Sequence, residues 1–107
     1  MSNKTLFDEI NAIQEESHTK WCKRYFDKID IEKCIKRRVA EGYKSAEISI
    51  LSEKDPYIKR RLDNERTVEY LKHRLGKGFV VKNEKVHSKF KISEHPIIER
   101  HALIISW

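Results

Sequence analysis

The chain has 107 residues, of which 37% are charged and 38% hydrophobic, and its formal net charge is +6. A chain of this length forms one domain with one modest core, because folding buries roughly two-thirds of its unfolded surface. Three glycines and two prolines exclude a low-complexity chain and favour a helix-rich, soluble fold. No apolar run approaches the ~20 residues that cross a bilayer, so we expect no membrane association.

The two cysteines, Cys22 and Cys34, form no CxxC pair, and no secretory leader precedes them. We therefore expect a reducing compartment such as the cytoplasm.

The charge is unevenly distributed along the chain. Residues 1 to 17 carry a net charge of −3, whereas Lys20 to Arg38 holds eight basic and three acidic residues, and Lys59 to Lys77 holds seven basic and three acidic. The sequence therefore predicts an acidic helical leader followed by a basic domain, whose surface suits phosphate or an acidic protein face.

The chain begins with an amphipathic helical pattern. Thr5 or Ser2 is placed to cap a short first helix, and Leu6, Ile10 and Ile13 form a narrow apolar stripe along it.

A second helical pattern follows, with a broad face made by Trp21, Cys22, Tyr25, Phe26 and Ile29. The aromatic side chains have two interpretations: they pack on the sheet, or Trp21, Tyr25 and Phe26 remain available as a protein-binding surface, where such rings are enriched. Residues 1–29 are predicted to form a helical N-terminal extension of an α+β domain at 30–107.

That domain opens with a helix, its end and a strand in direct succession. Asp30 is placed to cap the helix, and Gly42 provides the positive φ that ends it at about Glu41. The predicted buried face of the helix contains Ile31, Cys34, Ile35 and Val39. The period then changes to two, which predicts a strand with Ala46, Ile48 and Ile50 on its buried face.

Asp55 followed by Pro56 predicts the start of another helix. Asp63 and Asn64 interrupt its pattern, so we expect one broken helix or two abutting ones, ending at Gly76. A second strand starts at residues 78–81, and residues 82–95 form either an edge strand or a long hairpin loop. Residues 102–107 alternate as a further strand, expected to pair with residues 78–82.

This order predicts an α+β fold with a small, mainly antiparallel sheet of three or four strands and helices packed on one face.

Three features of residues 31–107 recur together: a basic helix running into a strand of the form GxxSxxIS (here GYKSAEIS), a second helix before G[FY]xV (GFVV), and a terminal ISW. In these features the chain resembles a loose group of small, largely uncharacterised proteins from phages and large DNA viruses. The resemblance implies this fold and a viral origin, and with it the cytoplasm of a host cell as the location, or alternatively a virion. It implies no catalytic residue.

The candidates for chemistry are few. His87, His95 and His101 have spacings that match no structural zinc pattern, and His18 and Cys22 stand at i and i+4 without a third group. No phosphate-binding glycine motif is present. We therefore expect no metal, no cofactor, no catalytic residue and no enzymatic activity; should turnover be found, these C-terminal histidines are the first to test.

The basic side chains form two candidate nucleic-acid-binding groups without a helix-turn-helix, RRM or zinc-finger signature. Such runs are often only a solvated face. The candidate residues are Lys33, Lys36, Arg37 and Arg38 on the first helix of the domain, and Lys59, Arg60 and Arg61 on the next.

Three functions follow from these observations. The first is a virus-encoded interaction protein that binds and modulates a host or viral protein, for example by inhibiting a host defence. The second is a sequence-tolerant DNA- or RNA-binding protein, and the third is a small virion component that forms homo-oligomers.

Overall fold

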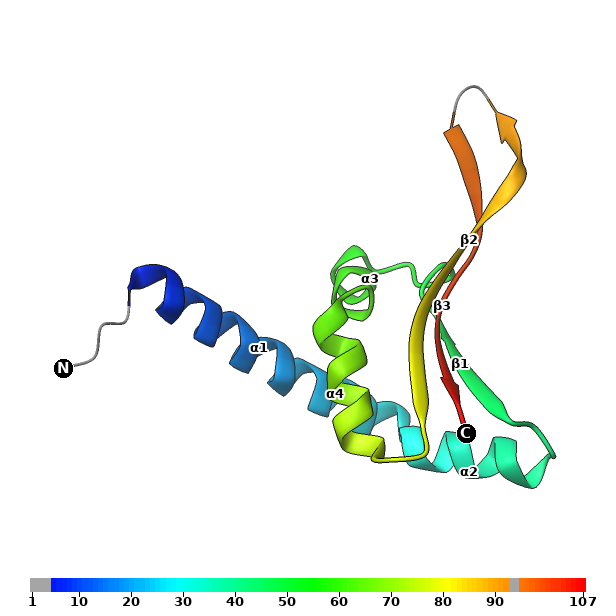
Figure 1. Ribbon diagram of the computed structural model, residues 1–107, viewed down its shortest axis with the longest axis horizontal. Helices are drawn as coiled ribbons and strands as arrows, with labels where there is room; N and C mark the ends of the chain where they lie inside the picture. The colour runs from blue at the N-terminus through cyan, green and yellow to red at the C-terminus, as the bar shows by residue number, and fades with distance from the viewer. Residues whose placement is uncertain (1–4, 93–94) are drawn as a thin grey trace.

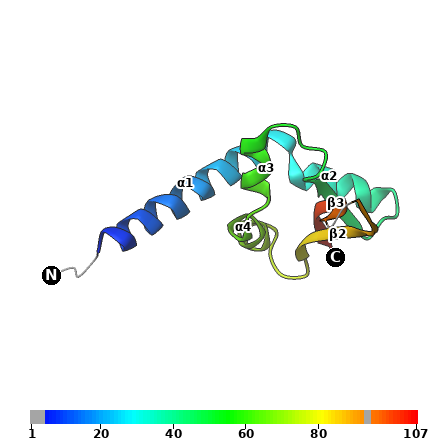
Figure 2. The same ribbon diagram turned by 90° about the horizontal axis from the view of Figure 1, so that it is seen from above.

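The computed structural model describes residues 5–92 and 95–107. It contains four helices and a three-stranded antiparallel sheet with helices packed on one face, so the predicted α+β class is confirmed (Figures 1 and 2). Its Cα radius of gyration is 16.7 Å, where a compact domain of this length has about 13 Å. The excess reflects two projecting parts, the N-terminal half of helix α1 (Leu6–Ile29) and the far end of the hairpin formed by strands β2 (Val80–Ile92) and β3 (His95–Ser106) (Figure 1).

Helix α1 runs without a break from Leu6 to Ile29. The expectation of two successive helices is wrong, because the residues between the two apolar patterns include no glycine or proline that would end the first one. Thr5 forms a reciprocal capping box with Asp8, as the first of the two predicted caps. Ser2, the other candidate cap, lies outside the described residues.

Asp30 ends α1 and begins α2 (Ile31–Ala40). It has a φ of 52° and its side chain accepts a hydrogen bond from the Lys33 amide, as a helix cap does. The predicted end of α2 is confirmed, with Glu41 as its C-cap and Gly42 at a φ of 90°.

The predicted buried face of α2 is only half right. Ile31 and Ile35 are buried, whereas Cys34 and Val39 are exposed. Only a narrow face of this short helix contacts α1 and strand β1, so no described element covers the rest of the predicted stripe.

Two short helices follow strand β1 (Ser45–Ser49). Asp55 caps α3 (Pro56–Leu62) and Asn64 caps α4 (Glu65–Leu75), so the predicted start and the predicted interruption are both confirmed. Each cap side chain accepts a 2.9 Å hydrogen bond from the amide two residues on. Gly76 ends α4 with a φ of 87°.

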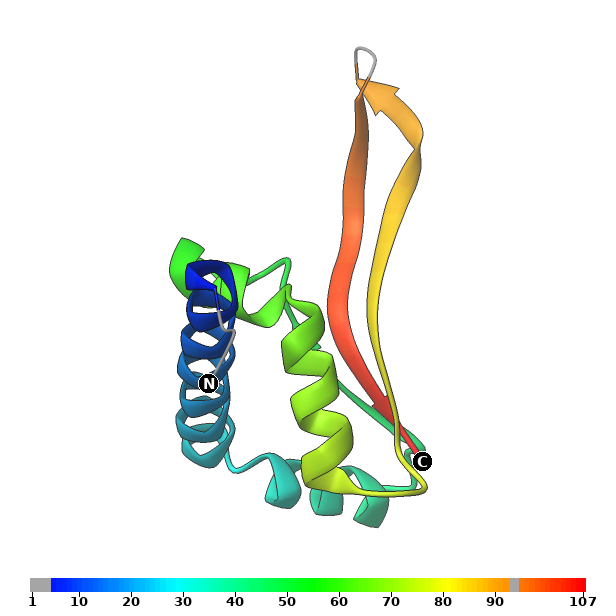
Figure 3. The ribbon, with the colours of Figure 1, turned by 60° about the vertical axis from the view of Figure 1, so that its left-hand side comes forward.

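The sheet has the order β1-β3-β2, with β2 at Val80–Ile92 and β3 at His95–Ser106. Ile105 of the central strand lies between Ala46 and Val81, which confirms the expected pairing of the last strand with the start of β2. Residues 82–95 were expected to form either an edge strand or a long hairpin loop. In the part that the structure describes, residues 82–92 belong to the edge strand β2. The hairpin rises beyond the helices (Figure 3).

One core joins the packed part of α1 to the rest of the molecule. Side chains from both sides of the expected boundary at residue 29 share this cluster, which includes Phe26, Ile35, Leu71, Leu103 and Ile105. The proposed division into an extension and a domain stays a prediction. Within the described residues, no helix is long and apolar enough to cross a membrane.

Candidate functional site

The N-terminal half of α1 projects from the body of the molecule (Figures 1 and 3). From Thr5 to Ser17 every residue except Asn11 is exposed, and burial begins at His18. This free half of α1, defined as residues 5–17, contains four carboxylates and no basic residue.

An apolar stripe runs along this free half. Leu6, Phe7 and Ile13 are 70%, 71% and 65% exposed, and Ile10 is 43% exposed. At 100° per residue these four side chains fall within one third of the helix circumference. The sequence predicted the stripe through three of these residues; the structure adds Phe7 and leaves the stripe uncovered by the described part of the chain.

The aromatic cluster predicted as a contact surface lies mostly inside the molecule. Phe26 is fully buried and stacks on Tyr70 of α4 at 5.9 Å, and Trp21 is 9% exposed and stacks on half-buried Tyr25 at 4.9 Å. Phe26 therefore has no surface to offer a partner. The burial interpretation holds, although the rings pack chiefly on α4 and one another, where we expected the sheet.

The two predicted groups of basic side chains do not form one surface. Helix α2, with Lys33, Lys36, Arg37 and Arg38, lies at the opposite end of α4 from helix α3 (Figures 1 and 3). The first three are exposed, whereas half-buried Arg38 donates to the Ser45 carbonyl at 3.2 Å and stacks on Tyr43. Arg38 thus supports the turn after α2.

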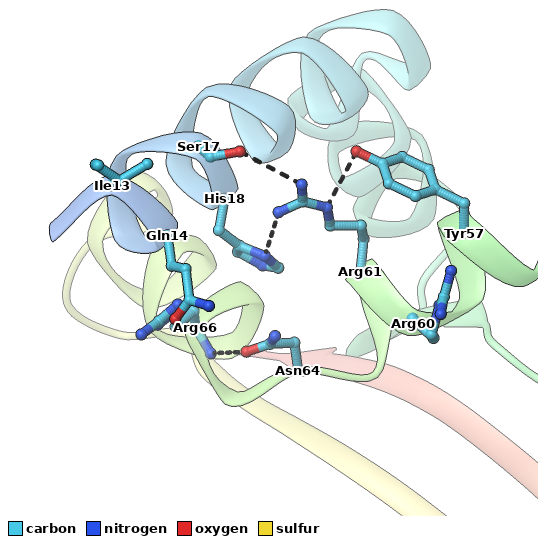
Figure 4. A pocket seen from close by; sticks show the side chains of 9 residues that line it. All are labelled: Ile13, Gln14, Ser17, His18, Tyr57, Arg60, Arg61, Asn64 and Arg66. Atoms are coloured by element: carbon cyan, nitrogen blue, oxygen red, sulfur yellow. Dashed lines mark hydrogen bonds between the residues drawn. The ribbon is translucent and has the colours of Figure 1, made fainter. Parts of the chain in front are cut away.

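The α3 group borders a cleft. Arg60 and Arg61 line a cavity of about 520 Å³ between α1 and the α3–α4 junction, and Lys59 is half-buried outside it. Figure 4 shows the basic cleft, whose other lining residues are Ile13, Gln14, Ser17, His18, Tyr57, Asn64 and Arg66. Ile13 belongs both to the apolar stripe and to this cleft, so the two features adjoin.

The guanidinium of Arg61 spans the cleft. It donates from Nε to the Tyr57 hydroxyl at 3.2 Å and from Nη2 to Ser17 Oγ at 3.4 Å, and its Nη1 lies 3.1 Å from Nδ1 of His18 (Figure 4). Arg61 therefore ties α3 to α1 across sequence separations of more than forty residues.

Hydrogen-bond donors and acceptors fix the tautomer of His18. Thr67 Oγ1 donates to the Arg61 carbonyl, so it has to accept from His18 Nε2, which lies 2.7 Å away. The proton of the neutral ring is then on Nε2, and Nδ1 is free to accept from Arg61. The result is a closed ring of hydrogen bonds through Arg61, His18 and Thr67 that joins α1 to the α3–α4 junction.

Burial lowers the pKa of His18 below its ordinary value, and the positive charges of Arg61 and Arg66 lower it further. His18 is therefore neutral near pH 7, which agrees with its hydrogen-bond pattern. Burial raises the pKa of the neighbouring Cys22 thiol, whose Sγ lies 3.8 Å from Thr67 Oγ1. A protonated, buried thiol is a poor nucleophile, so the i and i+4 pair of His18 and Cys22 reads as a structural contact.

A second polar cluster, absent from the sequence-based predictions, ties three helices together. Arg74 of α4 binds both carboxylate oxygens of Glu32 at 2.6 and 3.0 Å and Asp27 at 2.7 Å, and it also donates to the Tyr70 hydroxyl. Its hydrogen bonds lower the pKa of both carboxyl groups. A bidentate guanidinium pair of this kind fixes orientation as well as distance.

The structure describes the side chains of two of the three C-terminal histidines, and these two have different surroundings. His101 is buried, its Nε2 lies 3.0 Å from Asn83 Oδ1 and 3.2 Å from Asp63 Oδ1, and His87 is exposed on β2. The side chain of His95 lies outside the described residues. Among the side chains that the structure describes, no three from His, Cys, Asp and Glu converge as metal ligands do.

No protein-family model, curated protein or solved structure matches the chain.

Proposed function

We propose that this chain is a virus-encoded, non-enzymatic interaction protein that binds a host or viral protein, and that the free half of α1 is its docking element. One observation carries the proposal: the apolar stripe of Leu6, Phe7, Ile10 and Ile13 is exposed on a regular helix. Amphipathic helices commonly bind partner grooves through anchors at this i, i+4, i+7 spacing. The viral origin rests on the resemblance of residues 31–107 described above.

The charge of the free half indicates the chemistry of the partner. Asp8, Glu9, Glu15 and Glu16 are its only ionisable side chains, and helical geometry places Glu9 and Glu16 directly beside the stripe. The complementary surface is an apolar groove with lysine or arginine side chains on its rim, because opposite charges steer association and fix the register of the helix.

A second copy of the chain fits the stripe less well. Residues 6 to 13 span only about 12 Å of helix, and two such stripes face to face bury far less than the roughly 800 Å² per partner of a stable interface. Pairing two free halves also brings their carboxylates together, which opposes association. A groove that encloses the helix on three sides buries more of each anchor.

The test uses the full chain carrying Ile10→Gln and Ile13→Gln, with Val39→Gln as the control because Val39 is an exposed aliphatic residue on another helix. Tagged proteins are incubated with host-cell lysate with and without nuclease, and the captured protein is purified and titrated by calorimetry. We expect one partner that survives nuclease, binds the wild type and Val39→Gln alike, and loses at least about tenfold in affinity for the double variant. Equal binding by all three proteins would contradict docking through the stripe.

Two other results would redirect the assignment. Capture that disappears with nuclease and weakens on replacing Lys33 and Lys36, which are exposed on α2, would favour nucleic-acid binding. Concentration-dependent self-association that the double variant loses would identify a second copy as the occupant, as a virion component requires.

A further inference from the structure

The basic cleft contains three guanidinium groups and no carboxylate among its lining residues. Arg60, Arg61 and Arg66 come from two helices and meet the α1 face that carries Gln14, Ser17 and His18 (Figure 4). Uncompensated positive charge concentrated in one concavity is unfavourable for folding, since like charges repel and the walls weaken solvent screening.

Arg61 is held in place and still has donors to offer. Three of its five N–H groups are used by Tyr57, Ser17 and His18, so two remain. A guanidinium fixed by contacts to two helices loses little conformational freedom when it binds a ligand.

Arg60 and Arg66 flank it. Both are exposed, and neither side chain forms a hydrogen bond or ion pair with the described residues. On its other side Arg66 borders a separate hollow lined by Glu15, Glu65 and Glu69, so carboxylates nearby compete for its guanidinium. The lining of the basic cleft, to which Arg60 belongs, contains no carboxylate.

The remaining lining groups suit a polar ligand of limited size. Tyr57 presents a half-exposed ring, and Gln14 and Asn64 add amide groups at the edge. A volume of about 520 Å³ is in the range of small-molecule sites and exceeds what one phosphate group fills.

We propose that the basic cleft between α1 and the α3–α4 junction binds a phosphate group, with Arg60 and Arg61 as principal ligands and Arg66 as a third. Guanidinium groups match phosphate oxygens in geometry as well as charge. The phosphate comes either from a nucleotide-sized ligand or from the backbone of a single-stranded nucleic acid. The site shares Ile13 with the apolar stripe, but its proposed ligands, the three arginines, lie outside the stripe, so either proposal can fail without the other.

The first test measures binding at constant ionic strength and pH 7.5 to four probes: inorganic phosphate, adenosine monophosphate, adenosine and a ten-nucleotide single-stranded DNA. The variants are Arg60→Gln, Arg66→Gln and the control Arg37→Gln, which removes the same charge from exposed α2. We expect saturable binding of adenosine monophosphate but not adenosine, reduced about tenfold by Arg60→Gln, less by Arg66→Gln, and unchanged by Arg37→Gln.

His18 supplies a second, local readout. The charged groups that act on its ring are Arg61 of α3 and Arg66 of α4, and both His18 Nε2 and the Cys22 thiol hydrogen-bond to Thr67. A bound phosphate counteracts the two positive charges, so the pKa of His18 followed by NMR should rise in the wild type and in Arg37→Gln. At a phosphate concentration that half-saturates the wild type, the pKa should rise much less in Arg60→Gln, because its site is mostly empty.

The outcomes are decisive. Tighter binding of the oligonucleotide than of adenosine monophosphate, with the same dependence on Arg60, identifies nucleic acid as the source of the phosphate; the reverse order identifies a small ligand. Equal losses in Arg60→Gln and Arg37→Gln, binding of adenosine as tight as that of its monophosphate, or no binding of any phosphate probe would overturn the proposal.

Discussion

The two halves of α1 belong to one unbroken helix and have opposite surroundings. From Thr5 to Ser17 the side chains are almost all exposed, whereas His18, Trp21, Cys22 and Phe26 are buried. A helix of about twelve residues is marginal by itself in water, so the packed half has to support the free half as its continuation. The contrast shows that apolar spacing along a helix does not reveal whether a surface of the same chain covers it.

We expect the largest effect when the same substitution, phenylalanine to alanine, is made in the packed half and in the free half of this helix. Phe26→Ala should lower the free energy of unfolding by about 3 to 5 kcal/mol, because it empties a buried site against Tyr70. Phe7→Ala, on the exposed half, should change it by less than about 0.5 kcal/mol. Urea denaturation at 25 °C measures both. Similar losses at the two positions would mean that the free half is packed in solution.

A smaller, pH-dependent effect arises at the boundary between the halves. The pKa of His18 in the folded protein is lowered from 6.5. Below about pH 6.5 the His18 imidazole is therefore protonated in the unfolded chain but still neutral in the folded protein. This contribution to stability is complete above that pH and is lost as the pH falls toward the folded pKa, at no more than about 1.4 kcal/mol per pH unit.

Urea denaturation at several pH values between 7.5 and 5 gives the free energy of unfolding as a function of pH. Its slope should follow this expectation in the wild type and should be smaller in His18→Gln. The lowered pKa values of Asp27 and Glu32 act below about pH 4.5, outside this window. Identical slopes in the two proteins would argue against a neutral, buried His18.

We expect the smallest effect from a substitution that removes the capping box of the free half. Thr5→Ala deletes the side chain that accepts from the Asp8 amide, a loss of about 1 kcal/mol for the local helix. Because residues 5–17 add little to the core, global stability should change by less than about 0.5 kcal/mol while the first turns fray. Circular dichroism and hydrogen exchange of these amides detect the fraying. A loss of the full ~1 kcal/mol in the global free energy of unfolding would contradict this expectation, because it would mean that the free half unfolds together with the core.

The parts of the fold that sequence predicted are those determined by near neighbours. Asp30, Asp55 and Asn64 cap helices through amides two or three residues away, and Gly42 and Gly76 end helices through their own φ angles. The alternation around Ile48 likewise needs only the strand itself. These interactions extend over a few residues, so the local sequence contains all of their participants.

The candidate sites depended on distant residues and were predicted only in part. Arg60 and Arg61 stood out as basic residues. The local sequence did not indicate, however, that His18 Nε2 lies 2.7 Å from the hydroxyl of Thr67, because these residues are 49 positions apart in the chain. The same holds for Arg74, which meets Glu32 across 42 positions. Val39 was wrongly placed on a buried face, and Phe26 was left between two interpretations, because burial depends on which other element covers a face. The sequence signals of the cleft were the basic pair Arg60 and Arg61 and the i, i+4 pair of His18 and Cys22, and neither signal indicated that α1 and α3 lie together.

The strand order has a consequence for the timing of folding during synthesis. In the part of the chain that the structure describes, strands β1 and β2 each pair with β3, which lies between them and follows both in the chain. Before β3 has emerged from the ribosome, neither strand has this partner, and the helices have no completed sheet to cover. The nascent protein therefore exposes the apolar faces of β1 and β2 until β3 emerges, and we expect chaperones to bind it during that interval.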